Sequence, residues 1–536
     1  MSNEHYVYEA LSYEANSHPI RLVRILPGES GGQIACQLFR TQLIDLEHGS
    51  IPESRTDSKN LKGGEVRQNP KYTALSYVWG DQADTVTIQI NGKKLSVTRN
   101  LFKFLHCHRE SFLTERRTEG LFWIDAICID QSNIHERSKQ VQFMAEVYKN
   151  AKNVLVWLGA PTKPAAHALK HMFKRRLSPQ EEQARDTVFS GGWWDRLWVI
   201  QEAAHARSLL VRCGSFEFSW EDIKSLEPEP VYYTTMRLFL GRQKSSSKNA
   251  IDELETFGAQ KCYDPRDVIF ALRSILPALI PIVPDYSACT ADVFTSAARA
   301  IIFEAKNLTM LENTNRIGSS RWSLLESKPL PFWVPDWTLG VSGHLPVGDG
   351  RRRGESHEID HVLSLEDANI LLLRGTTVDR IDGSSAPFEE TYVKNERIAQ
   401  IQSWFPDCEK EFIQSNTWPQ IKLGAIVNDW LYRKGKNVQT TEPVLSDKWL
   451  LLYSLQGYSF ITTKSDRYGF MLGEAKEGDL VFAAYCSRYP FVLRLANTLE
   501  ESYTIVGCVI IDDLKMGEVF EMIKRGGLQE QEILLR

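Results

Sequence analysis

The sequence predicts an α/β fold with a mainly parallel sheet, followed by an α-rich middle region and a β-rich C-terminal domain. Three observations predict it. Short, nearly continuous apolar runs near the N-terminus are typical of strands buried on both faces of a parallel sheet, and helix-patterned segments separate them. The middle of the chain has helical periodicity, and strand-like apolar runs return near the end. Because 536 residues exceed what one hydrophobic core organises, we divide the chain into residues 1–215, 216–340 and 341–536.

The predicted sheet begins with a hairpin and continues with three parallel strands. Residues 20–26 and 34–44 have the pattern of two paired strands, and residues 48–70 form a polar loop. The three buried apolar runs are residues 72–79, 120–129 and 153–159.

Helices and a second hairpin lie between these strands. Residues 100–111 and 136–151 have helical patterns, the second with an apolar face. Residues 85–98 alternate on both sides of Asn91-Gly92, which indicates a β-hairpin inserted into the α/β unit.

The rest of the chain is helical first and strand-like later. Asp264 is the expected N-cap of a helix that has Pro265 in its first turn, and we expect Asp264, Arg266 and Asp267 to form an ion-pair cluster. The other predicted helices are residues 219–230, 234–243, 290–307 and 393–413. Strand-like runs at residues 369–381, 449–463, 478–486, 490–496 and 503–511 predict a small β-barrel or β-sheet.

Composition excludes several classes of protein. The net charge is −5 with scattered basic residues, and the short runs at 174–176 and 351–353 are typical of solvated loops, so we expect no nucleic-acid or anionic-lipid partner. No signal peptide and no spanning helix are expected. Nine cysteines form no CxxC pair, which suits reduced thiols in a cytoplasmic protein. His106-Cys107-His108 lacks a second ligand cluster, so we expect no metal.

Polar residues follow the predicted strands at the edge where parallel α/β sheets bind ligands. The first buried strand runs into Trp79 and Asp81, and the second into Asp125 and Asp130. We expect Asp125 or Asp130 to line a cleft. The alternative is structural: Asp130 or Ser132 caps the next helix, and Asp125 pairs with an arginine or a backbone donor.

Glu202 is a carboxylate in the segment WWDRLWVIQEAAHA, residues 193–206, which is otherwise mostly apolar. The segment has a helical pattern, and Trp198 lies one turn before Glu202. An indole beside a carboxylate suits a flat ring or a sugar. Equally, Glu202 pairs with Arg196 or Arg137 and only docks the helix; spacing alone does not separate the two interpretations.

Several blocks of the sequence resemble one family. Residues 72–81, 121–159 and 193–204 are similar, in order, to three blocks of the fungal heterokaryon incompatibility (HET) domain, and residues 262–272, 281–288, 331–338 and 478–518 resemble segments that follow this domain in family members. The resemblance implies a trigger of cell death in fungal allorecognition, acting with an incompatibility partner protein.

The HET domain is similar in outline to the Toll/interleukin-1 receptor (TIR) domain, which implies a flavodoxin-like parallel sheet and a homo-oligomer when active. Catalytic TIR domains carry a helical Trp-Cys-x-x-Glu segment. Here Trp198 and Glu202 keep that spacing, with Val199 in place of the Cys.

The TIR likeness implies cleavage of the nicotinamide–ribose bond of NAD, which is then a substrate and not a cofactor. Glu202 is the expected catalytic group, since a carboxylate under the ribose stabilises an oxocarbenium-like transition state. From the likeness and the strand-end positions, we expect Trp79 and Trp198 to stack on a ring of NAD. We expect Asp81, Asp125 and Asp130 to orient the ribose or a water molecule. Arg137 or Arg196 would bind the pyrophosphate.

Two other classes of protein compete with an NAD-cleaving enzyme. A non-enzymatic signalling module would use its Trp-rich helix as core and Glu202 as a salt-bridge partner. A hydrolase with a Ser or Cys nucleophile is poorly supported, because the chain has no G-x-S-x-G segment.

Overall fold

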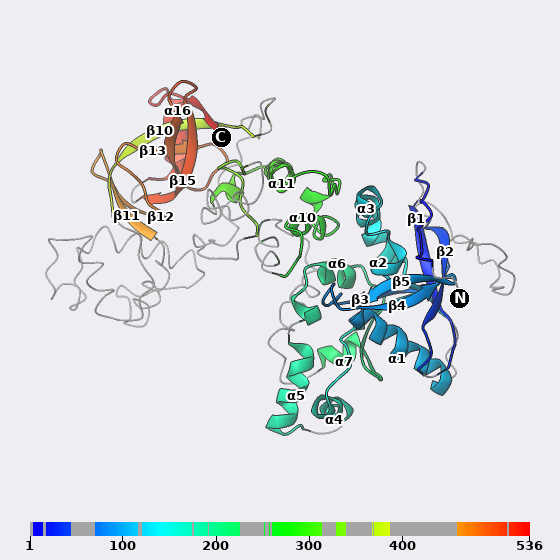
Figure 1. Cartoon of the computed structure of the whole chain (residues 1–536). Coiled ribbons are helices and arrows are strands. Elements are labelled where there is room, and N and C mark those ends of the chain that lie inside the picture. Colours follow the sequence, from blue (N-terminus) through cyan, green and yellow to red (C-terminus); the bar gives the residue numbers. More distant parts are fainter. Residues whose placement is uncertain are drawn as a thin grey trace. The chain divides into compact units, whose positions relative to one another are not determined.

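A computed structural model gives the structure of most of the chain (Figure 1). The residues that it describes are 4–13, 18–29, 31–43, 70–115, 120–173, 176–190, 192–225, 251, 254, 257, 260–312, 329–338, 367, 369–385, 458–511 and 514–536. Predictions for residues 48–69, 174–175, 234–243, 351–353, 393–413 and 449–457 lie outside these ranges.

The chain forms two compact units. The first comprises Met1–Lys248 and Gln260–Ala288, and the second comprises Asn249–Ala259 and Cys289–Arg536. The three-region division made from the sequence stays a prediction.

The first unit is built on a sheet in the order β5-β4-β2-β1-β6-β3-β7-β8-β9. These strands are β1 (His18–Ile25), β2 (Ala35–Leu43), β3 (Tyr72–Tyr77), β4 (Thr85–Ile90), β5 (Lys93–Thr98), β6 (Leu121–Trp123), β7 (Asn153–Trp157), β8 (Leu209–Cys213) and β9 (Phe216–Ser219).

The centre of this sheet is parallel, as predicted. β6, β3, β7 and β8 run in the same direction, and β3 is buried at five of its six positions. The sheet as a whole is mixed, because β1 is antiparallel to β6 and β9 is antiparallel to β8. The expectation of a mainly parallel sheet is therefore correct for the core only; hairpins extend it at the edges.

Both predicted hairpins are present. β1 pairs with β2, and β4 pairs with β5 about a turn in which Asn91 has φ 50° and Gly92 has φ 80°. Two consecutive positive φ angles define the type I′ turn that this dipeptide favours.

Helices cover both faces of the sheet, and α1 and α3 lie on opposite sides of it in Figure 1. The helices of this unit are α1 (Arg99–Glu115), α2 (Asp125–Cys128), α3 (Ile134–Asn150), α4 (Lys163–His171), α5 (Pro179–Phe189), α6 (Trp198–Ala204), α7 (Trp220–Lys224) and α10 (Asp267–Phe270). α1 and α3 confirm the two helices predicted between the strands.

The apolar run at residues 120–129 is not one strand, contrary to the prediction. β6 ends at Trp123, and α2 begins at Asp125. The Asp125 carboxylate accepts the N–H of Ala126 at 2.7 Å, and the N–H of Cys128 bonds the carbonyl of Ile124 at 2.7 Å. An aspartate that bonds its neighbouring backbone competes with the strand ladder, and hydrophobic pattern alone does not reveal this.

The N-terminus of α3 is capped by Asn133, whose side chain accepts the N–H of Glu136 at 3.1 Å. Asp130 and Ser132, the caps considered from the sequence, bond to each other one turn earlier. The Glu136 carboxylate pairs with Arg21 of β1 at 2.6 Å, and both side chains are buried. Such a pair is strongly destabilising to break, since either partner alone would be an uncompensated charge.

The helix predicted to start at Asp264 is shorter than expected. α10 has only four residues, its N-cap is Arg266, and turns follow it. Asp264 and Arg266 form the predicted ion pair at 2.7 Å. The predicted cluster is wrong for Asp267, which accepts hydrogen bonds from Trp198 and Tyr286 instead.

The longer segment of the second unit begins with α11 (Thr290–Ala305), as predicted, and continues into a β-rich fold. Its strands are β10 (Leu371–Ser384), β11 (Tyr458–Thr463), β12 (Tyr468–Leu472), β13 (Leu480–Ala484), β14 (Phe491–Asn497), β15 (Ser502–Ile511) and β16 (Gln531–Leu535), and α16 (Met516–Lys524) precedes the last.

Six of these strands close into a ring, and β16 pairs with β10 and β15. β10 pairs with β11, β11 with β12, β12 with β15, β15 with β14, β14 with β13, and β13 returns to β10, all antiparallel. The long β10 therefore contacts both β13 and β11, and the fold is a small β-barrel, one of the two predicted forms. Closure removes the open edges that would otherwise be free to pair with other chains.

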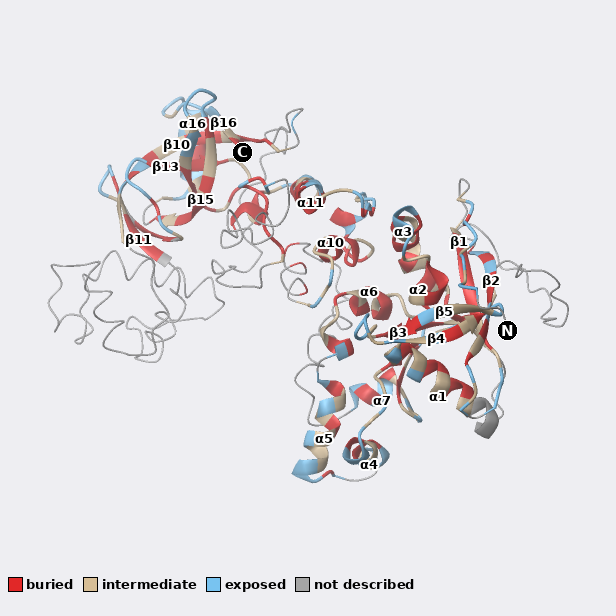
Figure 2. Ribbon diagram, in the orientation of Figure 1, coloured by how far each residue is buried: buried red, intermediate tan, exposed pale blue. Residues whose placement is uncertain are grey.

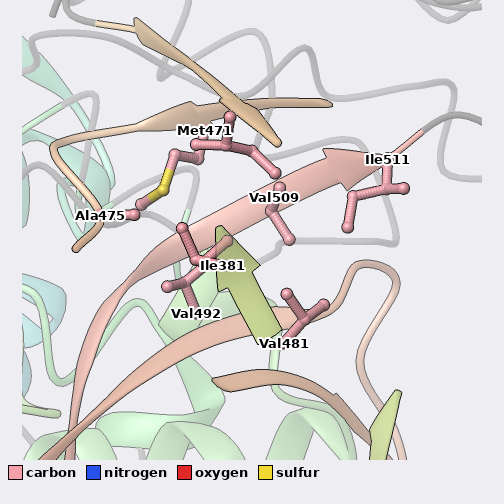
Figure 3. Packing of buried hydrophobic residues seen from close by; sticks show 8 residues of the cluster. Ile381, Met471, Ala475, Val481, Val492, Val509 and Ile511 are labelled. Atoms are coloured by element: carbon pink, nitrogen blue, oxygen red, sulfur yellow. The ribbon is translucent and has the colours of Figure 1, made fainter. Parts of the chain in front are cut away.

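An apolar cluster fills this barrel, with one or two residues from each strand of the ring (Figure 3). Its members are Ile381, Ile461, Met471, Ala475, Val481, Val492, Val509 and Ile511. Figure 2 shows that strands of both units carry long buried stretches, as β3 and β13 do. Within the described part of the chain, no helix has the length and apolarity needed to cross a membrane.

Candidate functional site

Two neighbouring parallel strands of the first unit end beside each other, and their following residues meet. Trp79 comes two residues after β3, and Asp125 two residues after β6. The Trp79 indole Nε1–H donates to Asp125 Oδ2 at 2.7 Å, while the N–H of Ala126 holds Oδ1. Trp79 and Asp125 are both partly exposed, so this pair lies where solvent reaches the sheet edge.

Glu202 lies deeper, on α6, with its residue only 2% exposed. The Ser76 hydroxyl on β3 donates to Glu202 Oε2. Ser76 in turn accepts the indole N–H of Trp193 at 2.6 Å, and Tyr148 of α3 lowers the pKa of the Glu202 carboxyl. The buried carboxyl is thus held by a hydroxyl group of the sheet.

Arg196 connects these two carboxyl groups electrostatically. Its guanidinium donates to the carbonyl of Tyr77 at the end of β3, and its positive charge lowers the pKa values of both Glu202 and Asp125. The backbone around Arg196 is fixed, because Lys261 bonds the main chain of Asp195 and of Leu197. We call the group formed by Glu202, Arg196, Asp125 and Trp79 the acidic cluster.

Burial sets the protonation of this cluster. It raises the pKa of Glu202 to about 7, with Arg196 and the Ser76 hydrogen bond opposing the rise and the charge of Asp125 adding to it. Burial also raises the pKa of Asp125, against the opposing effects of Arg196 and the Trp79 hydrogen bond. Glu202 therefore exchanges between its acid and carboxylate forms near neutral pH.

The structure brings together four of the eight residues predicted for the site, and the other four have separate contacts. Asp81 is exposed and accepts the N–H of Ala83 at 2.9 Å. Asp130 accepts the Ser132 hydroxyl at 2.6 Å. Arg137 lies over the Tyr286 ring, with 4.0 Å between its Cζ and the ring centroid.

Trp198, the fourth of these residues, anchors α6 at its first residue. Its indole N–H donates to Asp267 Oδ2 at 3.0 Å, and the Tyr286 hydroxyl donates to Oδ1 at 2.7 Å. Burial raises the pKa of Asp267 to about 6, although both hydrogen bonds oppose this. The helix that carries Glu202 is thereby attached to the segment that carries α10.

Sequence reasoning missed Ser76, Tyr148 and Trp193. One signal for Ser76 was available, since it is the hydroxyl in the middle of the apolar run at 72–79, and a buried hydroxyl requires a partner. Tyr77 was missed as well: it is buried, and its hydroxyl lies near Asp125 but outside hydrogen-bonding geometry.

The acidic cluster offers carboxylates and a cation but no ligand set for a metal. Among the described residues, no three His, Cys, Asp or Glu side chains lie close enough to hold a metal ion. The cysteines that the structure describes are free thiols.

Comparison with known proteins identifies the region that contains this cluster. Residues 72–202 match the family model described as heterokaryon incompatibility protein (HET), an interval that runs from the first residue of β3 to Glu202. No solved structure matches the chain.

Two curated relatives match parts of the chain. One is heterokaryon incompatibility protein 6, OR allele, of Neurospora crassa, which is 25% identical over 363 residues, covering 50% of this chain and 53% of the relative. The other is vegetative incompatibility protein HET-E-1 of Podospora anserina, which is 29% identical over 116 residues, covering 21% of this chain and 8% of the relative. The chain thus spans about half the length of the first relative and a small part of the second.

Proposed function

We propose that this chain, which carries a HET domain over residues 72–202, is an effector of fungal incompatibility. Its acidic cluster is proposed to cleave the nicotinamide–ribose bond of NAD. In this proposal the protein acts in the cytoplasm with an incompatibility partner protein, assembles into a homo-oligomer when active, and triggers cell death by consuming NAD. The names of the two relatives support the incompatibility role. The observation that carries the chemistry is the set of contacts at the carboxyl ends of β3 and β6, where the Trp79 indole donates to Asp125 and Arg196 donates to the carbonyl of Tyr77, next to the Ser76 hydroxyl that donates to Glu202.

The reaction suits a site built from carboxylates. When the bond from ribose C1′ to the nicotinamide ring nitrogen breaks, its electron pair goes to that nitrogen and neutralises the ring, so no general acid is needed. C1′ becomes oxocarbenium-like, and negative charge nearby stabilises it. Water then adds to C1′ and gives up a proton, which a carboxylate accepts before passing it to solvent.

The surroundings make that negative charge effective. Coulomb interactions are several-fold stronger in a partly desolvated site than in water. The Trp79 indole donates to Asp125, and the buried Trp193 indole donates to Ser76, which holds Glu202. The positive charge of Arg196 reduces the repulsion between the Glu202 and Asp125 carboxylates, which favours ionisation of both. Its remaining N–H donors suit a pyrophosphate.

One observation favours a second candidate, a non-enzymatic signalling module. Glu202 is only 2% exposed and is hydrogen-bonded within the domain, as a residue that only holds the fold would be. Under this alternative the HET domain triggers death by assembly with a partner. The enzymatic function requires the Glu202 carboxylate for the reaction, whereas the signalling function requires it only for the fold.

The test is release of nicotinamide from NAD by the purified full-length protein, measured at low and at oligomer-promoting concentrations. The wild type should release nicotinamide, and Glu202→Gln should lower the rate by about 100-fold, the usual scale for one electrostatic group. Glu221→Gln is the matched control, since Glu221 is an exposed helical glutamate that pairs with Lys224. It should keep the wild-type rate.

Absence of nicotinamide release in every state would remove the enzymatic proposal. If cell killing then persists in a folded Glu202→Gln variant, the signalling module is the better description. Circular dichroism of each variant establishes that a lost rate is not a lost fold.

A further inference from the structure

We propose that Asp125, and not Glu202, is the carboxylate that contacts the ribose, and that Glu202 is a positioning residue that acts on this contact through Arg196. The inference rests on the proposed function, because it assigns roles within the same acidic cluster. It differs from the sequence expectation, in which Glu202 is the catalytic group.

The first step is access. The Glu202 residue is 2% exposed, so a substrate reaches its carboxyl only if α6 or the side chain moves. Asp125 is partly exposed and is the first residue of α2, two residues after β6, at the sheet edge where α/β proteins bind ligands. Asp125 is therefore the more exposed residue of the two, although burial still raises the pKa of its carboxyl group.

The second step is hydrogen-bonding capacity. An ionised carboxylate has about four acceptor positions. The described donors to Asp125 are the Trp79 indole on one oxygen and the Ala126 N–H on the other. These two bonds fix the orientation of the carboxylate and leave acceptor positions for a pair of ribose hydroxyls, which are donors of matching spacing.

The third step is how Glu202 acts at a distance. Ser76 donates to the Glu202 carboxyl, and Arg196 donates to the carbonyl of Tyr77, the next residue of β3. The charge of Arg196 lowers the pKa of both Glu202 and Asp125, so the protonation of Glu202 changes how much of that charge acts on Asp125. When Glu202 is ionised, the cluster carries one more negative charge, which favours a cationic transition state at Asp125. The groups that act on Glu202 from each neighbouring element are Ser76 and Tyr77 of β3, Asp125 of α2, Tyr148 of α3 and Arg196 before α6.

Carboxyl footprinting of the full-length protein tests the assignment. A carbodiimide with glycine ethyl ester amidates accessible carboxyl groups, and mass spectrometry of the peptides reports each site. Carba-NAD, in which a methylene replaces the ribose ring oxygen, is the probe because it keeps the hydroxyls and is not hydrolysed. Asp125 should be labelled in the free protein and protected by carba-NAD, while Glu202 should remain unlabelled in both states.

Two variants provide a second, independent readout. Asp125→Asn should weaken carba-NAD binding by about 10-fold or more, as expected for a lost hydrogen bond to a charged group. Glu202→Gln should keep that affinity within about two-fold and abolish the rise of the nicotinamide-release rate as pH increases through about 7. Asp84→Asn is the matched control: Asp84 is an exposed aspartate that pairs with Arg99, and both properties should stay at wild-type values.

The outcomes separate this inference from the proposed function. Nicotinamide release with no protection of Asp125, or with protection of Glu202, overturns the inference and leaves NAD cleavage standing. Weakened binding in Glu202→Gln but not in Asp125→Asn overturns it as well. If the wild type neither releases nicotinamide nor protects any carboxyl group with carba-NAD, the proposed function fails, and the inference fails with it.

Discussion

The Trp79 indole donates to the Asp125 carboxylate at 2.7 Å, and this bond ties the end of β3 to the end of β6. The two residues are 46 positions apart in the sequence, yet the parallel register of the two strands brings them to the same edge of the sheet. A charged group at a sheet edge is thereby held in one orientation. This contact, the buried carboxyl groups of Glu202 and Asp267, and the barrel can each be tested by substitution.

We expect Trp79→Phe to impair the acidic cluster without unfolding the domain. Phenylalanine keeps an aromatic ring but cannot donate to Asp125, so the pKa of Asp125 should rise further. Nicotinamide release should fall by about 10-fold. The nicotinamide-release rate and the denaturation midpoint are measured for the variant and the wild type. An unchanged rate in the folded variant would show that the indole N–H does not support the reaction.

Glu202 makes the stability of the first unit depend on pH. Its folded pKa of about 7 lies above the ordinary value of 4.5, so between these values the folded protein holds a proton that the unfolded chain has released. This stabilisation is fully present below about pH 4.5 and is lost as pH rises through about 7, at about 1.4 kcal/mol per pH unit. Denaturant unfolding at a series of pH values measures it.

Glu202→Gln should remove this pH dependence. Glutamine stays neutral, so relative to the wild type the variant should gain on the order of 3 kcal/mol between pH 4.5 and pH 7. Asp267 titrates with the same sign and should leave a residual slope in the variant. Parallel stability curves for the two proteins would mean that Glu202 is ionised throughout.

Trp198→Phe should weaken the attachment of α6 to the α10 segment. It leaves Asp267 with Tyr286 as its remaining described donor, and the lost bond to a buried charged group costs about 1 to 3 kcal/mol. The loss should be largest above the Asp267 pKa of about 6, where the carboxylate is ionised. The free energy of unfolding, measured at about pH 5 and about pH 8, compares the protonated and ionised forms of Asp267. A larger loss of stability at the lower pH would contradict the role of the Asp267 charge.

Gly375→Ala should disrupt the barrel. A Cβ at Gly375 would lie 2.0 Å from the carbonyl oxygen of Ala483 and 2.8 Å from the Cα of Ala484, both in the backbone of the paired strand β13. No side-chain rotation relieves such a contact, so we expect the fold of the second unit to be lost or destabilised by several kcal/mol. Near-ultraviolet circular dichroism and thermal unfolding would report it.

Gly517→Ala is the matched control for this substitution. Gly517 lies in α16, and a Cβ there meets nothing within 4 Å. Alanine should therefore be tolerated, or should stabilise the helix by up to about 1 kcal/mol. Equal damage from both substitutions would show that the close approach at Gly375 is not the cause.

The candidate site was only partly predictable from the sequence. Strand-end position indicated Trp79 and Asp125, and helical spacing indicated Glu202, because both arguments depend on local periodicity. The same arguments also indicated Asp81 and Asp130, which bond to their own turns instead. Whether an aspartate faces a ligand or its own backbone depends on the local path of the chain, which periodicity does not specify.

By itself, the sequence determined three strands of the parallel core of the first unit, its two hairpins, α1, α3 and α11, and five strands of the barrel ring; β8 and β12 were not predicted. Each predicted element depends on residue pattern over a short stretch, as at Asn91-Gly92. Only the tertiary structure decided that Glu202 is buried on Ser76 while Asp125 stays partly exposed, and that Trp198 donates to Asp267. Those outcomes depend on which distant segments pack together and exclude water, and exclusion of water is what sets the pKa of a carboxyl group.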